Sequence, residues 1–253
     1  MAMVFDQNDL SYLSMENGAE YYNVLKSNEK IETFSRLTVE LNYLYRTVTD
    51  KDVMHVKLLA LLDRLDLSTT EINKYTFFDF EKPYTRNLVA TDNKNYTLLL
   101  LCWTPGKESK IHNHPCDGCY IKALRGCIRE TLYSVHESSQ EILKNKTRFY
   151  CEGQVSYMTD DIGLHKIGNP NHDMGSVSMH LYTPPFSSCK VWATDGVGSL
   201  NKFEIGAMGF FSVMGHRSPF LEGRPGVHSR LMLEIASYFK KKNEAKENEL
   251  QFQ

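Results

Sequence analysis

Two histidines one residue apart, His112 and His114, have a spacing that could do chemistry. They stand at the start of a strand-like stretch, and residues two apart in a strand point to the same face. The two imidazoles would therefore converge and could bind a metal ion together. Paired surface histidines also occur without a metal, so the pair alone leaves both interpretations open.

The residues around the pair favour a metal. Gly106 lies six residues before the pair and Gly126 twelve residues after it, and farther along His165 precedes Asn169 by four. This arrangement resembles the two motifs of the cupin family, whose fold is a small β-barrel. The second motif is the looser match, with Thr159 where the family carries proline. Cupins include storage proteins, isomerases and oxygenases, so the fold does not decide the activity.

The residue that breaks the first motif is Cys119, which stands where most cupins carry a glutamate ligand. Three neutral imidazoles leave the full +2 charge on a bound ferrous ion, whereas two histidines and a carboxylate leave +1. A more positive ion favours a substrate that brings its own negative ligand, such as a thiolate. Three histidines would also suit zinc, as in hydratases, although no feature of the sequence selects a substrate for that chemistry.

A second group of polar residues alternates along a later strand. Ser178, His180 and Tyr182 share one face of the stretch 177–182, and its other face is apolar. An ordinary barrel strand points its apolar side inward, so the polar face would meet water. Alternatively, these three side chains line a polar cavity that faces the metal. The prolines that follow Thr183 predict that the strand ends there.

Four groups of residues together resemble cysteine dioxygenase of the animal type, and the likeness runs from about residue 30 to residue 219. They are His112-x-His114-x4-Cys119, Ile162-Gly-Leu-His165, Ser178-x-His180-x-Tyr182-x-Pro-Pro-Phe186 and Tyr84-Thr-Arg86-Asn87-Leu88. The chain departs from mammalian relatives at Gly118, where they carry histidine, and at Asn113, where they carry aspartate.

The resemblance implies a metal site with one Fe(II) per chain and no organic cofactor. Its ligands would be His112, His114 and His165. The sequence contains no P-loop, dinucleotide fingerprint or nucleophile elbow that would indicate another activity. The alternatives are a related enzyme acting on cysteamine or 3-mercaptopropionate, and a cupin that binds a metal and senses thiols without turnover.

The resemblance also assigns the substrate contacts. Arg86 would grip the substrate carboxylate, because a guanidinium matches a carboxylate with two parallel hydrogen bonds. Tyr84 would lie beside it, and Trp103 and Cys189 match family positions near the pocket. The implied substrates are L-cysteine and O2, and the implied product is L-cysteine sulfinic acid, on the route from cysteine to hypotaurine and taurine.

The remaining implied roles belong to a cross-linked pair and its supports. Cys119 and Tyr182 would form the family's thioether between sulfur and ring carbon. Ser178 and His180 would hold the Tyr182 hydroxyl in line by hydrogen bonds. Cys116 forms a C-x-x-C pattern with Cys119, but we interpret it as a spectator.

The elements that must position these residues fall into three parts. An apolar stripe from Phe34 to Val48, a second helix after Asp50 and a capping box at Ser68 predict an N-terminal helical segment over 1–83. Short β-rich runs then predict a mostly β, jelly-roll-like cupin barrel over 84–220. Examples are Tyr96–Trp103, Tyr120–Leu124, Ile128–Tyr133, Val155–Thr159 and Val177–Thr183. Residues 221–253 are expected to form a helical tail, with its helix over Arg230–Lys242, in one domain overall.

Composition narrows the partners. With 29 Lys+Arg against 31 Asp+Glu, the formal charge is -2, so no basic field would hold nucleic acid. No apolar run approaches the roughly 20 residues that span a bilayer. The N-terminus has no secretory signal pattern, which predicts a cytoplasmic location, and we expect a monomer. The six cysteines in a chain of this length are expected to be thiols.

Overall fold

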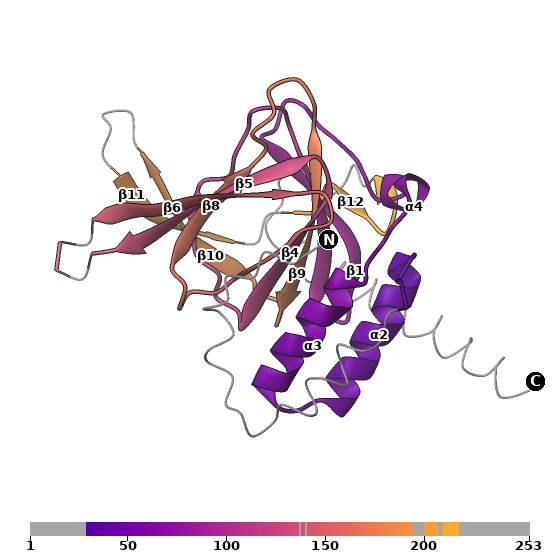
Figure 1. The fold of residues 1–253 in the computed structure, drawn as a ribbon. Helices are drawn as coiled ribbons and strands as arrows, with labels where there is room; N and C mark the ends of the chain where they lie inside the picture. The colour runs from indigo at the N-terminus through magenta and orange to yellow at the C-terminus, as the bar shows by residue number, and fades with distance from the viewer. Residues whose placement is uncertain (1–28, 137, 140, 195–199, 207–208, 218–253) are drawn as a thin grey trace, which may run out of the picture.

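The computed structural model describes residues 29–136, 138–139, 141–194, 200–206 and 209–217. Three helices come first: α2 (Phe34–Thr47), α3 (Lys51–Asp63) and α4 (Thr69–Asn73). The described strands follow from Tyr84 onward (Figure 1). The boundary between residues 83 and 84 thus coincides with the change from helices to strands, although the division into parts stays a prediction. The expected tail helix lies outside the described residues.

The helices begin at the caps that the sequence predicts, with one difference. The Asp50 carboxylate accepts a hydrogen bond from the amide of Val53, and the Ser68 hydroxyl accepts one from the amide of Glu71. The Glu71 side chain does not complete the capping box. Its Oε1 instead accepts from the amide of Phe34, so it ties α4 to the first turn of α2.

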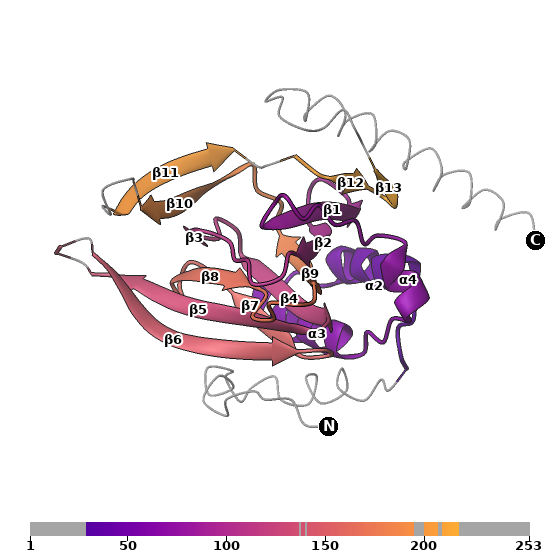
Figure 2. The ribbon, with the colours of Figure 1, turned by 90° about the horizontal axis from the view of Figure 1, so that it is seen from above.

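Two facing sheets form the rest of the described fold (Figure 2). The seven-stranded sheet has the order β13 (His216–Arg217), β12 (Ser212–Val213), β1 (Tyr84–Thr91), β2 (Thr97–Trp103), β9 (Ser176–Thr183), β4 (Gly118–Arg125) and β7 (Val155–Met158). The six-stranded sheet has the order β11 (Leu200–Gly206), β10 (Ser188–Thr194), β3 (Ile111–His112), β8 (Leu164–Gly168), β5 (Cys127–Val135) and β6 (Ile142–Cys151). The mostly β prediction is confirmed. The barrel takes the form of a two-sheet sandwich, because the ladders do not close into one continuous sheet.

The outer face of the seven-stranded sheet is covered by α2 and α3 (Figure 2). Phe34, Leu37 and Leu41 of α2 are buried in this apolar layer, as the helical stripe predicts. Each such side chain stabilises the fold by roughly 1.5–3 kcal/mol. Lys122 is 3% exposed on the same side, and its Nζ donates to the carbonyls of Leu62 and Asp63. This ammonium therefore anchors the end of α3 to the sheet.

Both faces of strand β9 are buried, each against a different layer. Its apolar residues, Val177 and Met179 among them, pack against the helix layer. Its polar residues are buried and point between the two sheets, which excludes the alternative that they face water. Helices cover the face that would otherwise be solvated, and the polar side chains line the interior of the sandwich instead.

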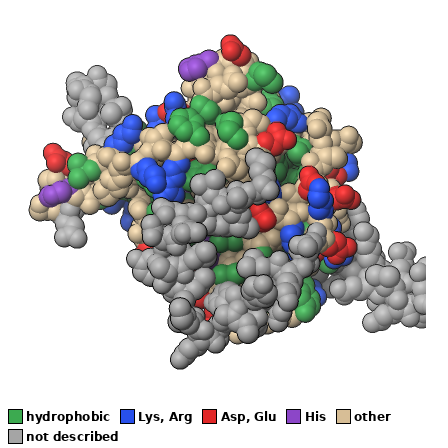
Figure 3. Space-filling model, in the orientation of Figure 1, with side chains coloured by type: hydrophobic (Ala, Val, Ile, Leu, Met, Phe, Trp, Pro, Cys, Tyr) green, Lys and Arg blue, Asp and Glu red, His purple; other side chains and the backbone are tan. Residues whose placement is uncertain are grey.

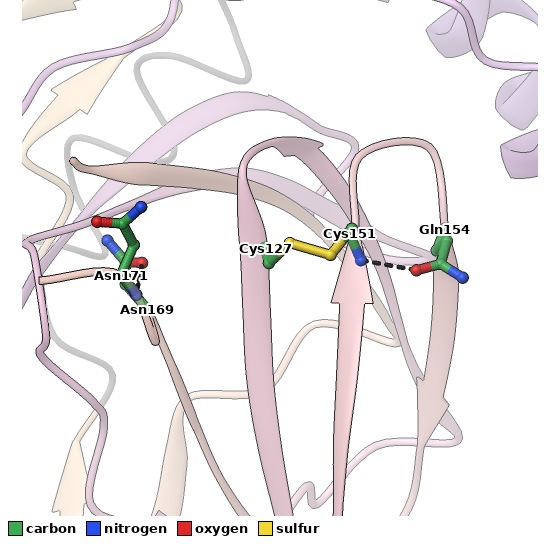
Figure 4. The surroundings of a disulfide bond; sticks show 5 residues. All are labelled: Cys127, Cys151, Gln154, Asn169 and Asn171. Atoms are coloured by element: carbon green, nitrogen blue, oxygen red, sulfur yellow. Dashed lines mark hydrogen bonds between the residues drawn. A yellow bond between two sulfur atoms is a disulfide. The ribbon is translucent and has the colours of Figure 1, made fainter. Parts of the chain in front are cut away.

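Two cysteines correct the prediction that all six are thiols. Cys127 and Cys151 lie opposite each other in the pairing of β5 with β6, and a disulfide joins their sulfur atoms (Figure 4). The amide of Cys151 donates to Oε1 of Gln154 at the following turn. Length and composition could not reveal this bond, because it depends on cross-strand register. Cys102, Cys116, Cys119 and Cys189 are free thiols.

The described surface shows no single-sign field on the face that Figure 3 displays, where acidic and basic side chains are interspersed. This distribution agrees with the near-neutral formal charge of -2. None of the described helices combines the length and the apolar composition that a bilayer-spanning helix needs.

Candidate metal centre and active site

Three imidazoles converge between the two sheets. His112 is the last residue of β3 and lies directly opposite His165 of β8, while His114 follows two residues later. Their ring centroids are 4.5–5.0 Å apart, and one ring nitrogen from each lies within 4.8 Å of the others. The expected strand from His112 to His114 is not formed, because β3 ends at His112. Convergence therefore depends on the loop as well as on strand alternation.

Hydrogen bonds on either side hold that loop in place. The carboxylate of Asp160 accepts from the amide of His114 at 2.6 Å and from Nδ2 of Asn113 at 2.8 Å. Oδ1 of Asn113 accepts from the amide of Lys190 in β10. Asn113, between the two histidines, therefore links the loop to Asp160 and to β10 and so fixes the direction of the two imidazoles.

The protein holds the imidazoles in their neutral form. Burial lowers the pKa of His112 below its usual value, and it lowers the pKa of His114 and of His165 well below it. Their mutual repulsion as cations depresses the last two further. A neutral imidazole offers the lone pair that a metal ion requires.

The cluster fits a divalent metal. Nδ1 of His112 lies 2.9 Å from the carbonyl oxygen of Lys110, and Nε2 of the same ring lies 3.2 Å from Nε2 of His165. Nδ1 of His114 is buried and has no hydrogen-bond partner within the described residues. Neutral imidazoles that are packed nitrogen to nitrogen, with one nitrogen unsatisfied, form a donor set that an ion would complete.

A chain of polar contacts runs beside the cluster. The indole of Trp103 donates to Oγ of Ser178 at 2.8 Å, and that oxygen lies 2.8 Å from Nε2 of His180. Nδ1 of His180 lies 3.4 Å from the hydroxyl of Tyr182. The ring centres of Tyr182 and His114 are 6.3 Å apart, so the tyrosine ring lies beside the imidazole cluster.

Cys119 and Tyr182 are direct neighbours across the β4–β9 ladder. Burial raises the pKa of the Cys119 thiol well above its usual value, although a hydrogen bond with Tyr182 opposes the shift. Burial likewise raises the pKa of the Tyr182 hydroxyl well above its usual value. Both groups are therefore protonated, and the fold has placed them side by side on neighbouring strands.

Arg86 supplies the positive charge of the site. It lies on β1, with its guanidinium 5.6 Å from the ring centre of Phe210. The pKa of His180 is lowered first by burial, then by His165 and His112, and then by the charge of Arg86. The same charge opposes the rise in the pKa of Tyr182 that burial causes. The structure thus brings Arg86 next to the imidazoles and the tyrosine.

The other three predicted substrate contacts, Tyr84, Trp103 and Cys189, lie around Arg86. The ring of Tyr84 packs 4.7 Å from that of Trp103, its partner in the β1–β2 ladder. Burial raises the pKa of Cys189, and the charge of Arg86 opposes that shift. All the sequence-predicted site residues consequently lie around one interior region, and their roles stay predictions.

Comparison with known proteins agrees with this geometry. A family model described as "Cysteine dioxygenase type I" matches residues 25–195. "Cysteine dioxygenase type 1" of Rattus norvegicus is 38% identical over 162 residues, which are 64% of this chain and 78% of the relative. The chain belongs to the cysteine dioxygenase type I family. The human relative is 35% identical over 71% of this chain and 88% of its own length, and the Danio rerio relative is 32% identical over 76% and 92%.

This member of the cysteine dioxygenase type I family contains two site residues that sequence reasoning missed. Oε1 of Glu130 lies 2.7 Å from Nδ1 of His165, and Asp160 clamps the histidine loop. Glu130 had a detectable signal, since it interrupts an inward-facing alternation whose other members, Ile128 and Leu132, are apolar. Asp160 lies in a turn with no pattern that indicates its partners.

Proposed function

We propose that this chain is a cysteine dioxygenase, which adds both atoms of O2 to the thiolate of L-cysteine and forms L-cysteine sulfinic acid. One observation carries the proposal: in a chain of this family, three neutral imidazoles meet in a buried site, and no carboxylate of the described residues joins them as a candidate ligand. Such a set leaves a divalent ion with its full charge, which favours an anionic sulfur ligand from the substrate.

The metal proposed for the site is a single Fe(II), held by His112, His114 and His165. When bound, ferrous iron would supply the Lewis-acid and redox chemistry that brings a thiolate and dioxygen to react. The protein's part is to exclude water from the imidazoles and to keep them neutral. His114 and His165 are 1% and 0% exposed, so burial does both.

Arg86 is proposed to orient the substrate by its carboxylate. A guanidinium presents two parallel N–H groups to the two oxygens, so the bound amino acid has a fixed direction relative to the imidazoles. Tyr84 and Trp103 form the packed wall behind it. Cys189 is proposed to line the same pocket. Holding the carboxylate at one end places the amine and the sulfur at the other end, toward the three histidines.

Tyr182 is proposed to hold a proton close to the reacting atoms. Its hydroxyl stays protonated because burial raises its pKa, and His180, fixed by Ser178, aligns it. The thioether between Cys119 and Tyr182 is proposed as well, on the basis of their cross-strand adjacency. Its formation would remove the thiol hydrogen and one ring hydrogen, with O2, the proposed co-substrate, as the oxidant. That bond would remove one rotational freedom from the ring and so keep the hydroxyl in place.

The finer setting follows from the proposed reaction. We place the sulfinate product in cysteine catabolism, toward hypotaurine and taurine, and propose a monomer in the cytoplasm. Four free thiols in the described structure suit a reducing compartment, whereas the Cys127–Cys151 disulfide would need protection there. Thiol labelling of the chain in intact cells measures whether that bond persists.

The test is oxygen uptake by chain loaded anaerobically with ferrous iron, with L-cysteine, cysteamine and 3-mercaptopropionate supplied in parallel. We expect sulfinate from L-cysteine, with stoichiometric oxygen consumption. Turnover of cysteamine or 3-mercaptopropionate in preference to L-cysteine would identify a different thiol dioxygenase. Iron bound at one per chain with no oxygen consumed from any thiol would contradict the enzymatic proposal.

The carboxylate contact is tested with Arg86→Ala and a matched arginine control. Arg125→Ala is the control, since Nη2 of Arg125 binds Oδ1 of Asn73 on the helix side of the sheet. We expect Arg86→Ala to raise KM for L-cysteine by about a hundredfold, the effect of losing a charged hydrogen-bonded pair. Cysteamine, which has no carboxylate, should respond much less. Equal losses for both thiols would contradict the clamp.

A further inference from the structure

We propose that Glu130 is a positioning residue of the metal site, which fixes the ring of His165 and places a negative charge one hydrogen bond away from the metal. The inference deepens the proposed function, because it takes the three-histidine cluster as the metal site. Nothing in the cupin-like motifs of the sequence includes this glutamate.

The first support is the contact itself. Glu130 and His165 are 1% and 0% exposed, and Oε1 lies 2.7 Å from Nδ1. An ionised carboxylate can only accept a hydrogen bond, so with Glu130 ionised Nδ1 carries the proton and Nε2 carries the lone pair. Nε2 is the nitrogen that faces His112, at 3.2 Å from its Nε2. Glu130 therefore sets both the tautomer and the direction of the ligand.

The second support is that the structure builds a seat for this carboxylate. Oγ of Ser156, on β7, donates to Oε2 at 3.2 Å. Tyr150, on β6, also hydrogen-bonds to the carboxyl group, and Nη1 of Arg148 lies 3.5 Å from the Tyr150 hydroxyl. Arg148 is directly opposite Glu130 in the β5–β6 ladder. Groups from β6 in the same sheet and from β7 in the facing sheet thus hold a carboxylate in the interior.

The third support is the energetic cost of having a glutamate there. A buried carboxylate is strongly unfavourable unless it is paired and hydrogen-bonded. The neighbouring inward positions of β5 hold Ile128 and Leu132, so an apolar residue would satisfy packing at position 130. A charged residue at this point is therefore explained by what it contacts, and it contacts a metal ligand.

The three imidazoles differ in this respect. Nδ1 of His112 faces a neutral backbone carbonyl, and Nδ1 of His114 has no hydrogen-bond partner in the described part of the chain. Within the described residues, the contact to His165 is the one that brings a carboxylate to a ring nitrogen of the cluster, since Asp160 binds the backbone amide of His114. Cys119 stands where most cupins carry a glutamate ligand, so the metal has no carboxylate there. The Glu130 carboxylate supplies a negative charge one hydrogen bond farther out, which makes the His165 imidazole more basic.

The test measures metal affinity, which does not require turnover. Wild-type chain, Glu130→Gln and Glu130→Leu are titrated with Zn²⁺ and Co²⁺ against a competing chelator. We expect Glu130→Leu to weaken binding by about 10–100-fold, the range seen when a ligand's supporting partner is removed. Glu130→Gln should lose less, because its amide oxygen still accepts from Nδ1. Its Co²⁺ visible spectrum should resemble wild type, whereas that of Glu130→Leu should change.

The matched control is Lys122→Met, which removes a buried charge on the opposite side of the same sandwich. We expect it to lower thermal stability without changing metal affinity. Wild-type affinity in both folded Glu130 variants would overturn the inference, as would an equal loss in Lys122→Met. Glu130→Gln is nearly isosteric and keeps the inference testable where Glu130→Leu does not fold.

The same titrations separate this inference from the proposed function. A wild-type chain that binds metal with the expected ranking of variants, yet consumes no oxygen with any thiol, supports the role of Glu130 and overturns the dioxygenase proposal. A wild-type chain that binds neither metal overturns both.

Discussion

The two faces of strand β9, within the seven-stranded sheet, are both buried and chemically opposite. Along β9, Val177, Met179 and Leu181 pack against the helices, while Ser178, His180 and Tyr182 point into the sandwich. In an isolated sheet the polar face would be the solvated one. Here the helices cover the outer face, so that face is apolar and the polar face turns inward. One strand therefore contributes alternately to a stabilising core and to a polar site.

The difference teaches that burial alone does not separate structural from functional residues in this fold. Outer-face side chains are satisfied by packing, and a change there should act on the free energy of unfolding. Inner-face polar groups are satisfied by one another, so a change there should act on metal binding and turnover. An outer-face variant that changes metal binding or turnover, or an inner-face variant that changes only the free energy of unfolding, would contradict this distinction.

The largest expected effect is loss of a metal ligand on the inner side. His165→Ala should abolish stoichiometric metal binding and reduce turnover at least about a thousandfold, because the several kcal/mol that a metal supplies are lost. Metal content after dialysis and oxygen uptake measure both. Near-normal iron content in this variant would contradict the assignment of the cluster.

The next effect concerns the tyrosine. Tyr182→Phe keeps the ring and removes the hydroxyl, so turnover should fall about a hundredfold, as for a group that positions or transfers a proton. The metal affinity should stay unchanged. In wild type, intact-mass analysis should reveal chains lighter by two hydrogen atoms, from the thioether with Cys119, and Cys119→Ser should remove that species. A wild-type population with no such species would refute the cross-link.

A smaller effect on turnover and a clear effect on stability are expected from Met179, on the apolar face of β9. Met179→Ala leaves a cavity under the helices and should cost about 2–5 kcal/mol in the free energy of unfolding. At temperatures where the variant stays folded, its KM for L-cysteine should match wild type. Denaturant titration measures the free energy of unfolding, and kinetics on the same samples measure KM. A raised KM would show that the two faces are coupled.

The smallest expected effect is a pH dependence of the metal-free chain. Burial lowers the pKa of His114, His165 and His180, so the unfolded chain binds more protons than the folded one below about pH 6.5. Their stabilising contribution is complete above that pH and is lost as the pH falls, by at most about 1.4 kcal/mol per pH unit for each histidine. Urea titrations from pH 5.5 to 7.5 measure the slope, which His180→Gln should reduce.

Local patterns in the sequence were sufficient for much of the fold. The stripe of α2, the caps at Asp50 and Ser68 and the end of β9 at Thr183 depend on neighbours in the chain. Motif spacing likewise pointed to the three histidines. Strands such as the lysine-rich β6 were missed, because their alternation is polar on both sides.

The remaining features depend on residues far apart in the chain. The Cys127–Cys151 disulfide follows from the register of β5 with β6, which no count of cysteines reveals. Glu130 acquires its role only when β8 brings His165 beside it. The direction in which Ser178 points depends on whether helices cover the sheet, and the strand sequence alone could not decide this.

Trp103 gives the molecule an optical reporter inside its own site. Its indole is 1% exposed, hydrogen-bonded to Ser178 and packed against Tyr84. The chain has a second tryptophan, Trp192 on β10, whose ring lies near the ammonium of Lys202. Replacing Trp192 with phenylalanine leaves a single emitter whose fluorescence responds to events beside the three histidines. Binding of metal and thiol can then be followed in real time by rapid mixing, without any attached dye.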